Sequence, residues 1–182
     1  MDHEDHITLL KAGVSSPGGI WGEFGSGRGA FTLALAELIG PDGTIYSVDN
    51  NAPALKDQDK AIQSKFSGRQ PKIYYLNADY TLPLSLPALD GVVIANSLHF
   101  HKDKAAVLKL IYDYLRPQGC LILVEYNTES GNTWVPHPVS YNAWYLLVQR
   151  NGFEKTRLIA RVPSSFLGEI YSAISYKKID RN

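Results

Sequence analysis

The residues best suited to chemistry are glycines at alternate positions behind an acid. The stretch "IWGEFGSGRGAFTLALAELIG", residues 20–40, holds Gly25, Gly27 and Gly29 between an apolar run and a helical pattern. Glycine permits a tight turn and close approach of a ligand to the backbone. A helix that begins there adds free N–H groups and a positive dipole end. The spacing predicts a ligand site at a strand–helix junction.

Two classes of ligand fit this spacing. The run "GSGRGA" also satisfies the dinucleotide fingerprint G-x-G-x-x-A. Glu23 stands two residues before the first of these glycines, and a carboxylate there would repel a bound pyrophosphate. It suits a ligand that carries an ammonium group and no phosphate, such as S-adenosylmethionine. The glycine spacing therefore leaves both classes open, and Glu23 favours a ligand with an ammonium group over a dinucleotide.

A pair of histidines follows the fourth apolar run. His99 and His101 come after "VVIANSL", and a histidine can act as a base near neutral pH. Alternate residues after a strand point to opposite sides, so one of the two is expected to face the site. We favour His99 as the catalytic residue, the alternative being that it packs, caps the next helix or only lines the pocket. No third ligand accompanies the pair, so no metal site is predicted.

Alternating strand and helix patterns position these residues. Five strand-like runs are separated by helical patterns, at residues 18–24, 44–49, 72–79, 89–98 and 120–126. Two more, 154–162 and 169–178, have no helix between them and are expected to pair antiparallel. The order predicts an α/β fold, a Rossmann-like, doubly wound, seven-stranded and mostly parallel sheet with a C-terminal antiparallel hairpin. Ligands bind beyond the carboxyl ends of such strands, beside the first.

Three segments, taken in order, carry a family resemblance. They are residues 23–49, "LNADYTLPL" at 76–84, and 89–126 with the run "NSLHFH". They resemble motif I, the strand-three acid and the fourth and fifth strands of class I S-adenosylmethionine-dependent methyltransferases, in particular the ubiquinone/menaquinone-type small-molecule enzymes. The resemblance implies that S-adenosyl-L-methionine is the cofactor and that its methyl group passes to a small-molecule acceptor by in-line displacement.

The resemblance also implies roles for the cofactor-binding residues at the first strand. Gly25, Gly27 and Gly29 would line the methionine and ribose parts, and Glu23 would meet the methionine amino group directly or through water. Ser26 stands among these glycines, where a small residue is common in the family.

Residues at the ends of the next three strands complete the implied cofactor site. Asp49 would accept hydrogen bonds from both ribose hydroxyls, and Asp79 from the adenine amino group, with Tyr80 beside the ring. Asn96 would lie near the methionine carboxylate and the methyl group. Asn50 departs from the pattern, because the family often has an apolar residue there against adenine.

Composition limits the remaining classes of function. The 182 residues fit one domain, 1–182, with residues 1–19 as an N-terminal lid segment and 20–182 as the catalytic core. Eighteen basic and eighteen acidic residues cancel, which gives no argument for nucleic acid. No long apolar run suggests an integral membrane segment. Cys120 is the only cysteine, so no internal disulfide is possible and a cytoplasmic location is expected.

Several alternatives stay open at this level. An NAD(P)-dependent oxidoreductase and a non-catalytic S-adenosylmethionine-binding module are the competing functions. The sequence is silent on oligomeric state, and a homodimer is kept as one possibility. An aromatic group after the fifth strand fits either an acceptor pocket or ordinary core and surface positions. Its members are Tyr126, Trp134, Tyr141, Trp144 and Tyr145.

Overall fold

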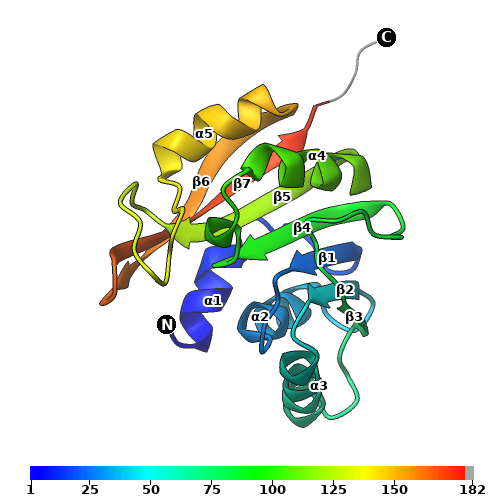
Figure 1. The fold of residues 1–182 in the computed structure, drawn as a ribbon. Coiled ribbons are helices and arrows are strands. Elements are labelled where there is room, and N and C mark those ends of the chain that lie inside the picture. Colours follow the sequence, from blue (N-terminus) through cyan, green and yellow to red (C-terminus); the bar gives the residue numbers. More distant parts are fainter. Residues whose placement is uncertain (179–182) are drawn as a thin grey trace.

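A seven-stranded sheet with helices on both faces forms the fold (Figure 1). The computed structural model describes residues 1–178. The predicted domain runs to residue 182, and residues 179–182 lie outside the described part. The strands are β1 (Ile20–Phe24), β2 (Thr44–Asp49), β3 (Lys72–Asn77), β4 (Leu89–Ala95), β5 (Leu115–Tyr126), β6 (Phe153–Ser164) and β7 (Gly168–Lys177). The helices are α1 (His3–Leu10), α2 (Ala30–Ile39), α3 (Ala52–Phe66), α4 (Lys104–Tyr114) and α5 (Tyr141–Arg150), with a 3₁₀ turn η1 (Leu98–Phe100).

The strand order confirms the predicted topology. Within the described residues it is β3-β2-β1-β4-β5-β7-β6. The first five strands pair in parallel, whereas β7 runs antiparallel between β5 and β6. The order reverses between β1 and β4, so their carboxyl ends form the switch point at which ligands bind in such sheets.

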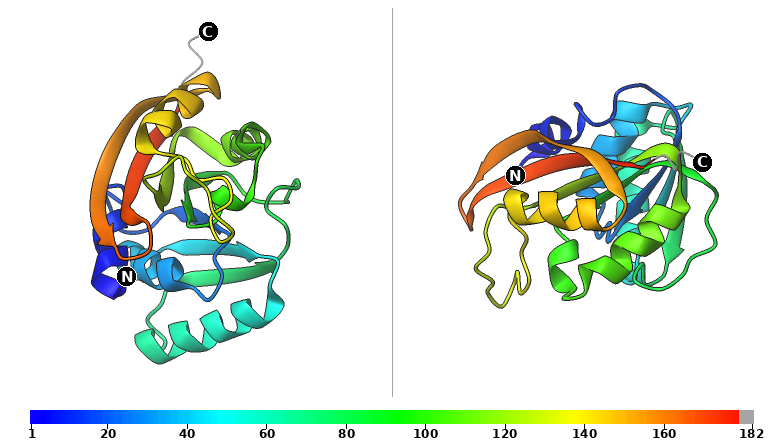
Figure 2. Two further views of the ribbon diagram at one scale, coloured as in Figure 1. Left: turned by 60° about the vertical axis from the view of Figure 1, so that its left-hand side comes forward. Right: turned by 90° about the horizontal axis from the view of Figure 1, so that it is seen from above.

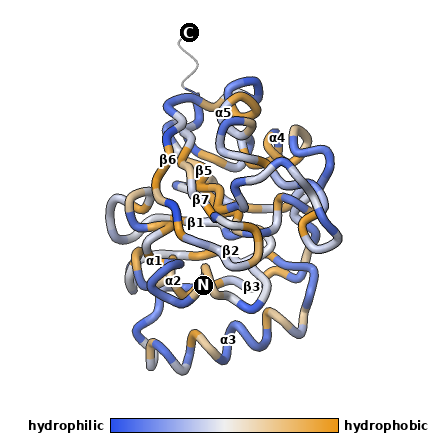
Figure 3. Tube along the Cα trace, turned by 90° about the vertical axis from the view of Figure 1, so that its left-hand side faces the viewer, coloured by the Kyte–Doolittle hydropathy of each residue, from blue (hydrophilic) through white to orange (hydrophobic). Residues whose placement is uncertain are grey.

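Two apolar clusters cover the two faces of the sheet. Helices α1 and α2, with Ile62 of α3, pack on one face, and α4 and α5 pack on the other. Figure 2 shows α4 and α5 across the strands from α1 and α2. Strand β4 is apolar almost throughout and buried on both faces, as expected between two helix layers. Figure 3 shows hydrophobic colouring along β5 and long hydrophilic stretches on α3 at the periphery.

Side-chain caps begin helices α4 and α5. Asp103 Oδ1 accepts hydrogen bonds from the amides of Ala105 and Ala106, and Ser140 Oγ accepts one from Ala143. Strand β5 differs from its prediction, because it begins at Leu115 rather than at Cys120. A register shift against β4 between Leu89 and Gly91 accommodates the added residues.

The N-terminal segment packs into the core. Leu9 and Leu10 of α1 are fully buried in the cluster that holds α2. Arg157 of β6 donates a 3.0 Å hydrogen bond to the carbonyl of Ala12, just after the helix. This packing gives the lid hypothesis for residues 1–19 no support.

Candidate active site

A cavity of about 400 Å³ opens at the carboxyl ends of β1, β2 and β4. Its lining gathers residues that lie far apart in the sequence, and most were predicted to bind the cofactor. They are Gly25, Gly27, Asp49, Asn50, Ala78, Asp79, Tyr80, Asn96, Ser97, Phe100 and His101. Parallel strands bring these positions together because their carboxyl ends share one edge of the sheet.

The glycine loop after β1 has little room for side chains. Gly25 has φ +74°, and a Cβ there would lie 2.4 Å from Ser97 Oγ. Gly29 has φ +85° and precedes α2, and a Cβ there would lie 2.3 Å from the Gln58 side chain. Gly29 is not among the lining residues, so its role here is to bring α3 close to the loop. Glycine is required at both positions by conformation and by space.

The Asp49 carboxylate is held at the edge of the cavity. Its Oδ2 accepts a 2.7 Å hydrogen bond from the amide of Gly27, and its Oδ1 accepts a 2.8 Å bond from that of Asn51. Each carboxylate oxygen can accept a further bond. Asp49 is only partly exposed and lines the cavity, so its carboxylate can accept these further hydrogen bonds from a ligand bound there.

Asp79 and Tyr80 line the side of the cavity after β3. Thr81 donates to Asp79 Oδ1 from both its hydroxyl (2.7 Å) and its amide (2.9 Å), which lowers the pKa of this carboxyl. Tyr80 is buried, which raises the pKa of its phenol, and its hydroxyl donates a 3.1 Å bond to the carbonyl of Ser97. The pair therefore presents an ionised acceptor beside a neutral aromatic ring.

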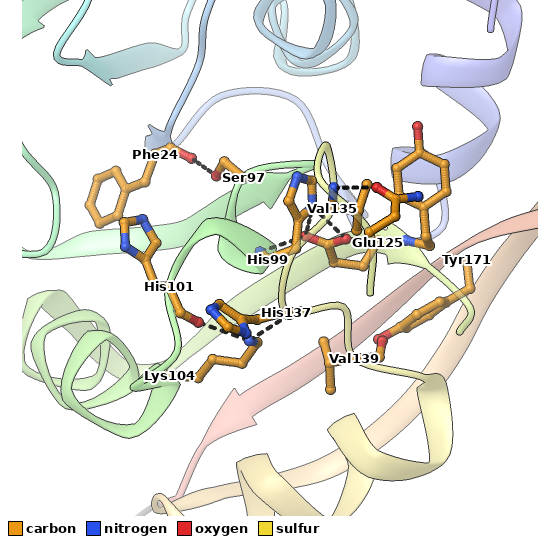
Figure 4. A network of polar contacts seen from close by, with 12 residues as sticks. Phe24, Ser97, His99, His101, Lys104, Glu125, Val135, His137, Val139 and Tyr171 are labelled. Atoms are coloured by element: carbon orange, nitrogen blue, oxygen red, sulfur yellow. Dashed lines mark hydrogen bonds and ion pairs between the residues drawn. The ribbon is translucent and has the colours of Figure 1, made fainter. Parts of the chain in front are cut away.

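Asn96 provides the clearest sign of a missing partner. It follows β4 in the left-handed region, with φ +49°. Its Oδ1 is buried and has no hydrogen-bond partner among residues 1–178. An unpaired buried acceptor is costly, so a ligand donor in the cavity would satisfy it. The neighbouring Ser97 hydroxyl donates a 3.0 Å bond to the carbonyl of Phe24 and joins β4 to β1 (Figure 4).

Glu23 lies behind the glycine loop and not in the cavity lining. It is 2% exposed and accepts a hydrogen bond from Thr32 Oγ1, which in turn accepts one from Gln58 Nε2. Ser47 Oγ lies 2.8 Å from both Gln58 Oε1 and Ser26 Oγ. Burial raises the pKa of Glu23 to about 8. The geometry therefore does not support a direct contact of Glu23 or Ser26 with a ligand, and both instead brace the loop.

The two histidines differ from the sequence expectation. Residues 98–100 form a 3₁₀ turn, so the alternation of an extended strand does not apply to them. His101 lines the cavity, edge-on to Tyr80 with ring centroids 5.1 Å apart, and burial lowers its pKa. His99 is 3% exposed, does not line this cavity, and contacts Glu125 on the neighbouring β5.

Two charged residues near the site were missed by sequence reasoning. Lys104 is buried at the start of α4, and its Nζ donates to the carbonyls of His101 (2.9 Å) and His137 (2.7 Å), as Figure 4 shows. Glu125 is fully buried in β5. An acid inside the apolar run "CLILVEY" is a signal that could have revealed Glu125, whereas Lys104 resembles any exposed helix lysine.

The aromatic group after β5 does not gather into one pocket. Trp144 is fully buried in the core, and Trp134 is 74% exposed. Tyr141 packs against Tyr171 with ring centroids 5.8 Å apart. These positions agree with the second interpretation, in which the aromatic residues occupy ordinary core and surface positions and do not form an acceptor pocket.

Residues 1–178 contain neither a metal-binding cluster nor a membrane-spanning helix. No three or more His, Cys, Asp or Glu side chains within residues 1–178 cluster in a way that could hold a metal ion. In the same range, none of the helices has the length and apolar character needed to cross a bilayer.

Comparison with known proteins identifies the family. The model described as "Methyltransferase domain" matches residues 22–123, more than half of the chain. The ubiquinone/menaquinone biosynthesis C-methyltransferase UbiE of Wigglesworthia glossinidia brevipalpis is 32% identical over 107 residues, 58% of this chain and 42% of that protein. The chain belongs to the methyltransferase domain family, and the predicted resemblance to the ubiquinone/menaquinone-type enzymes is confirmed. The chain spans about half the length of the curated relatives that it matches.

Solved structures confirm the fold. The 1,6-didemethyltoxoflavin-N1-methyltransferase of Burkholderia thailandensis superposes with a TM-score of 0.77 at 18% identity, covering 97% of this chain and 78% of that one. The YcgJ protein of Bacillus subtilis superposes with a TM-score of 0.76 at 12% identity, covering 97% and 100%. Membership of the methyltransferase domain family does not favour the oxidoreductase alternative.

Proposed function

We propose that this chain transfers the methyl group of S-adenosyl-L-methionine to a small-molecule acceptor. The observation that carries the proposal is the convergence of Gly27, Asp49, Asp79 and Asn96 around one cavity at the carboxyl ends of the strands. Membership of the methyltransferase domain family supports the activity. The Burkholderia thailandensis structure, which holds S-adenosylhomocysteine, supports the cofactor.

The lining residues offer a partner for each part of this cofactor. The two Asp49 oxygens match the vicinal hydroxyls of a ribose, and the ionised Asp79 beside Tyr80 matches an exocyclic amine on a flat ring. The unpaired Oδ1 of Asn96 would accept from the donors at the methionine end. Glu23 acts indirectly in this proposal, by bracing the glycine loop.

The acceptor side follows from the same placement. A cofactor held by Asp49 and Asp79 on one side and by Asn96 on the other would present its methyl group beyond β4, toward β5. The residues there are His99, Glu125 and the loop 127–140, whose His137 amide donates a 3.0 Å bond to the carbonyl of His99. The bound cofactor supplies an electrophilic methyl group, and the protein supplies alignment and exclusion of water. His99 is the proposed base for acceptors that must lose a proton.

Parallel calorimetric titrations with S-adenosylmethionine, S-adenosylhomocysteine and NADH test the cofactor. Micromolar binding of both adenosyl ligands without NADH binding is expected. Binding of NADH alone, or of none of the three, would overturn the proposal. Release of S-adenosylhomocysteine in the presence of pooled small-molecule acceptors then distinguishes an enzyme from a non-catalytic binding module.

Location and partners form the remaining part of the proposal. We propose a cytoplasmic enzyme that acts without nucleic acid, supported by the balanced charge and the single cysteine, Cys120. A homodimer is the assembly to test, by light scattering at several protein concentrations. The division into a single domain with a catalytic core at 20–182 also stays a proposal.

A further inference from the structure

A fully buried carboxylate faces the proposed base. Glu125 Oε1 accepts hydrogen bonds from the backbone amide of His99 (3.1 Å) and, together with Oε2, lies 2.9 Å from His99 Nδ1. Oε2 also accepts a 3.2 Å bond from the amide of Tyr126. Figure 4 shows the Glu125 carboxylate against the His99 ring, beside the loop that carries Val135.

This contact fixes the proton position on the imidazole. An ionised carboxylate accepts hydrogen bonds and donates none, so Nδ1 must carry the proton. The lone pair of the neutral ring is then on Nε2, on the opposite side. Nε2 has no hydrogen-bond partner within residues 1–178, yet it is not among the fully buried polar atoms of that range. A histidine that only pairs with Glu125 for structural reasons needs Nδ1 alone. A histidine that acts as a base also needs an Nε2 that is free of partners and can be reached by the acceptor.

Other titratable groups surround the pair. The ammonium of Lys104, from α4, interacts favourably with Glu125, and it is also bound to two carbonyls. His101 interacts electrostatically with His99, which adds to the lowering of the His101 pKa by burial. Three phenols, each with its pKa raised first by burial and then by Glu125, complete the surroundings: Tyr80, Tyr126 and Tyr171.

We propose that Glu125 is a positioning residue, which holds His99 with Nε2 unprotonated so that it accepts a proton from an O–H or N–H acceptor. This inference rests on the proposed function and narrows its substrates to acceptors with a removable proton. The acceptor's electron pair forms the new bond to the methyl carbon, and the electrons of the broken C–S bond stay on sulfur. The acceptor's proton moves to Nε2, and the resulting imidazolium is paired with Glu125. The step needs no oxidant, reductant or metal.

Nitrogen NMR of histidine-labelled protein, saturated with S-adenosylhomocysteine, tests the proposal. In the wild-type protein at pH 8, nearly all neutral His99 should carry its proton on Nδ1, with His99→Gln used to assign the signals. Glu125→Gln should shift His99 mainly to the Nε2–H form, which is favoured in free histidine. Glu154→Gln, at a partly exposed position in β6, is the matched control and should leave the His99 signals unchanged.

Results that contradict the role of Glu125 can be distinguished from results that contradict the proposed function. An Nε2–H form of His99 in the wild-type protein overturns the inference without any variant, even if Glu125→Gln does not fold. An Nδ1–H form that persists in folded Glu125→Gln overturns it as well. Failure of the same wild-type sample to bind S-adenosylhomocysteine by calorimetry contradicts the proposed function instead, and the His99 signals are then recorded without ligand.

Discussion

Asp49 and Gly27 are joined by a 2.7 Å hydrogen bond from the glycine amide to the carboxylate. The acid ends β2 and the glycine lies in the loop after β1, so the bond links the two strands at the edge of the cavity. The parallel register that pairs Phe24 with Val48 brings the two segments into reach. The Asp49 carboxylate and the glycine backbone are therefore already in position before a ligand binds, which reduces the free-energy cost of ordering the site on binding.

Replacing Asp49 with alanine should weaken binding of S-adenosylmethionine by about tenfold or more, because it removes charge-assisted hydrogen bonds. Asp49→Asn keeps one acceptor oxygen and should lose less. Calorimetry on folded protein measures both. Asp113→Ala, which removes an exposed acid paired with Lys109, is the control. An unchanged affinity in Asp49→Ala would remove this residue from the cofactor site.

Gly25→Ala should abolish detectable cofactor binding, because the new Cβ would meet Ser97 at 2.4 Å. Gly68→Ala has the same kind of strained backbone, with φ +86°, but nothing within 4 Å of its Cβ. Comparing the two variants separates the backbone penalty from the collision in the site. Thermal unfolding and calorimetry are the measurements, and equal effects of both variants on binding would contradict the prediction.

The raised pKa of Glu23, about 8, makes stability depend on pH. Between its ordinary value of 4.5 and about 8 the folded state holds the proton more tightly than the unfolded chain. Raising the pH through this window therefore lowers the free energy of unfolding. Between pH 6 and 9 the melting temperature of the wild-type protein should fall more than that of Glu23→Gln, by roughly 5 °C or more. Parallel pH dependences would show that Glu23 does not titrate in this range.

Lys104→Met should loosen the loop 127–140, because the carbonyls of His101 and His137 lose their common donor. The loss of free energy of unfolding should be about 1–3 kcal/mol, the usual cost of stranding buried polar groups. Hydrogen exchange should quicken in residues 127–140. Lys109→Met, on the exposed side of the same helix, should change neither quantity. Unchanged exchange in Lys104→Met would mean that other contacts hold this loop.

Local patterns determined much of the fold and the location of the site. The alternation of strand and helix patterns up to α5, and the two strand patterns without a helix between them after it, predict a mostly parallel sheet with a C-terminal antiparallel hairpin, which the structure has. The glycine spacing predicts a ligand site after β1, and the family resemblance adds Asp49 and Asp79, which line the same cavity as Gly27. These features are readable because strand ends and helix starts are set by neighbouring residues in the chain.

Only the tertiary structure decided what lies on each side of the glycine loop. Glu23 and Ser26 are next to the glycines in sequence, yet both are buried, Glu23 against Thr32 and Ser26 against Ser47. The 3₁₀ turn places His101 in the cavity and His99 against Glu125, 26 residues away in the chain. Side-chain direction at such positions depends on contacts between distant segments, and these contacts form only when the sheet and both helix layers close together.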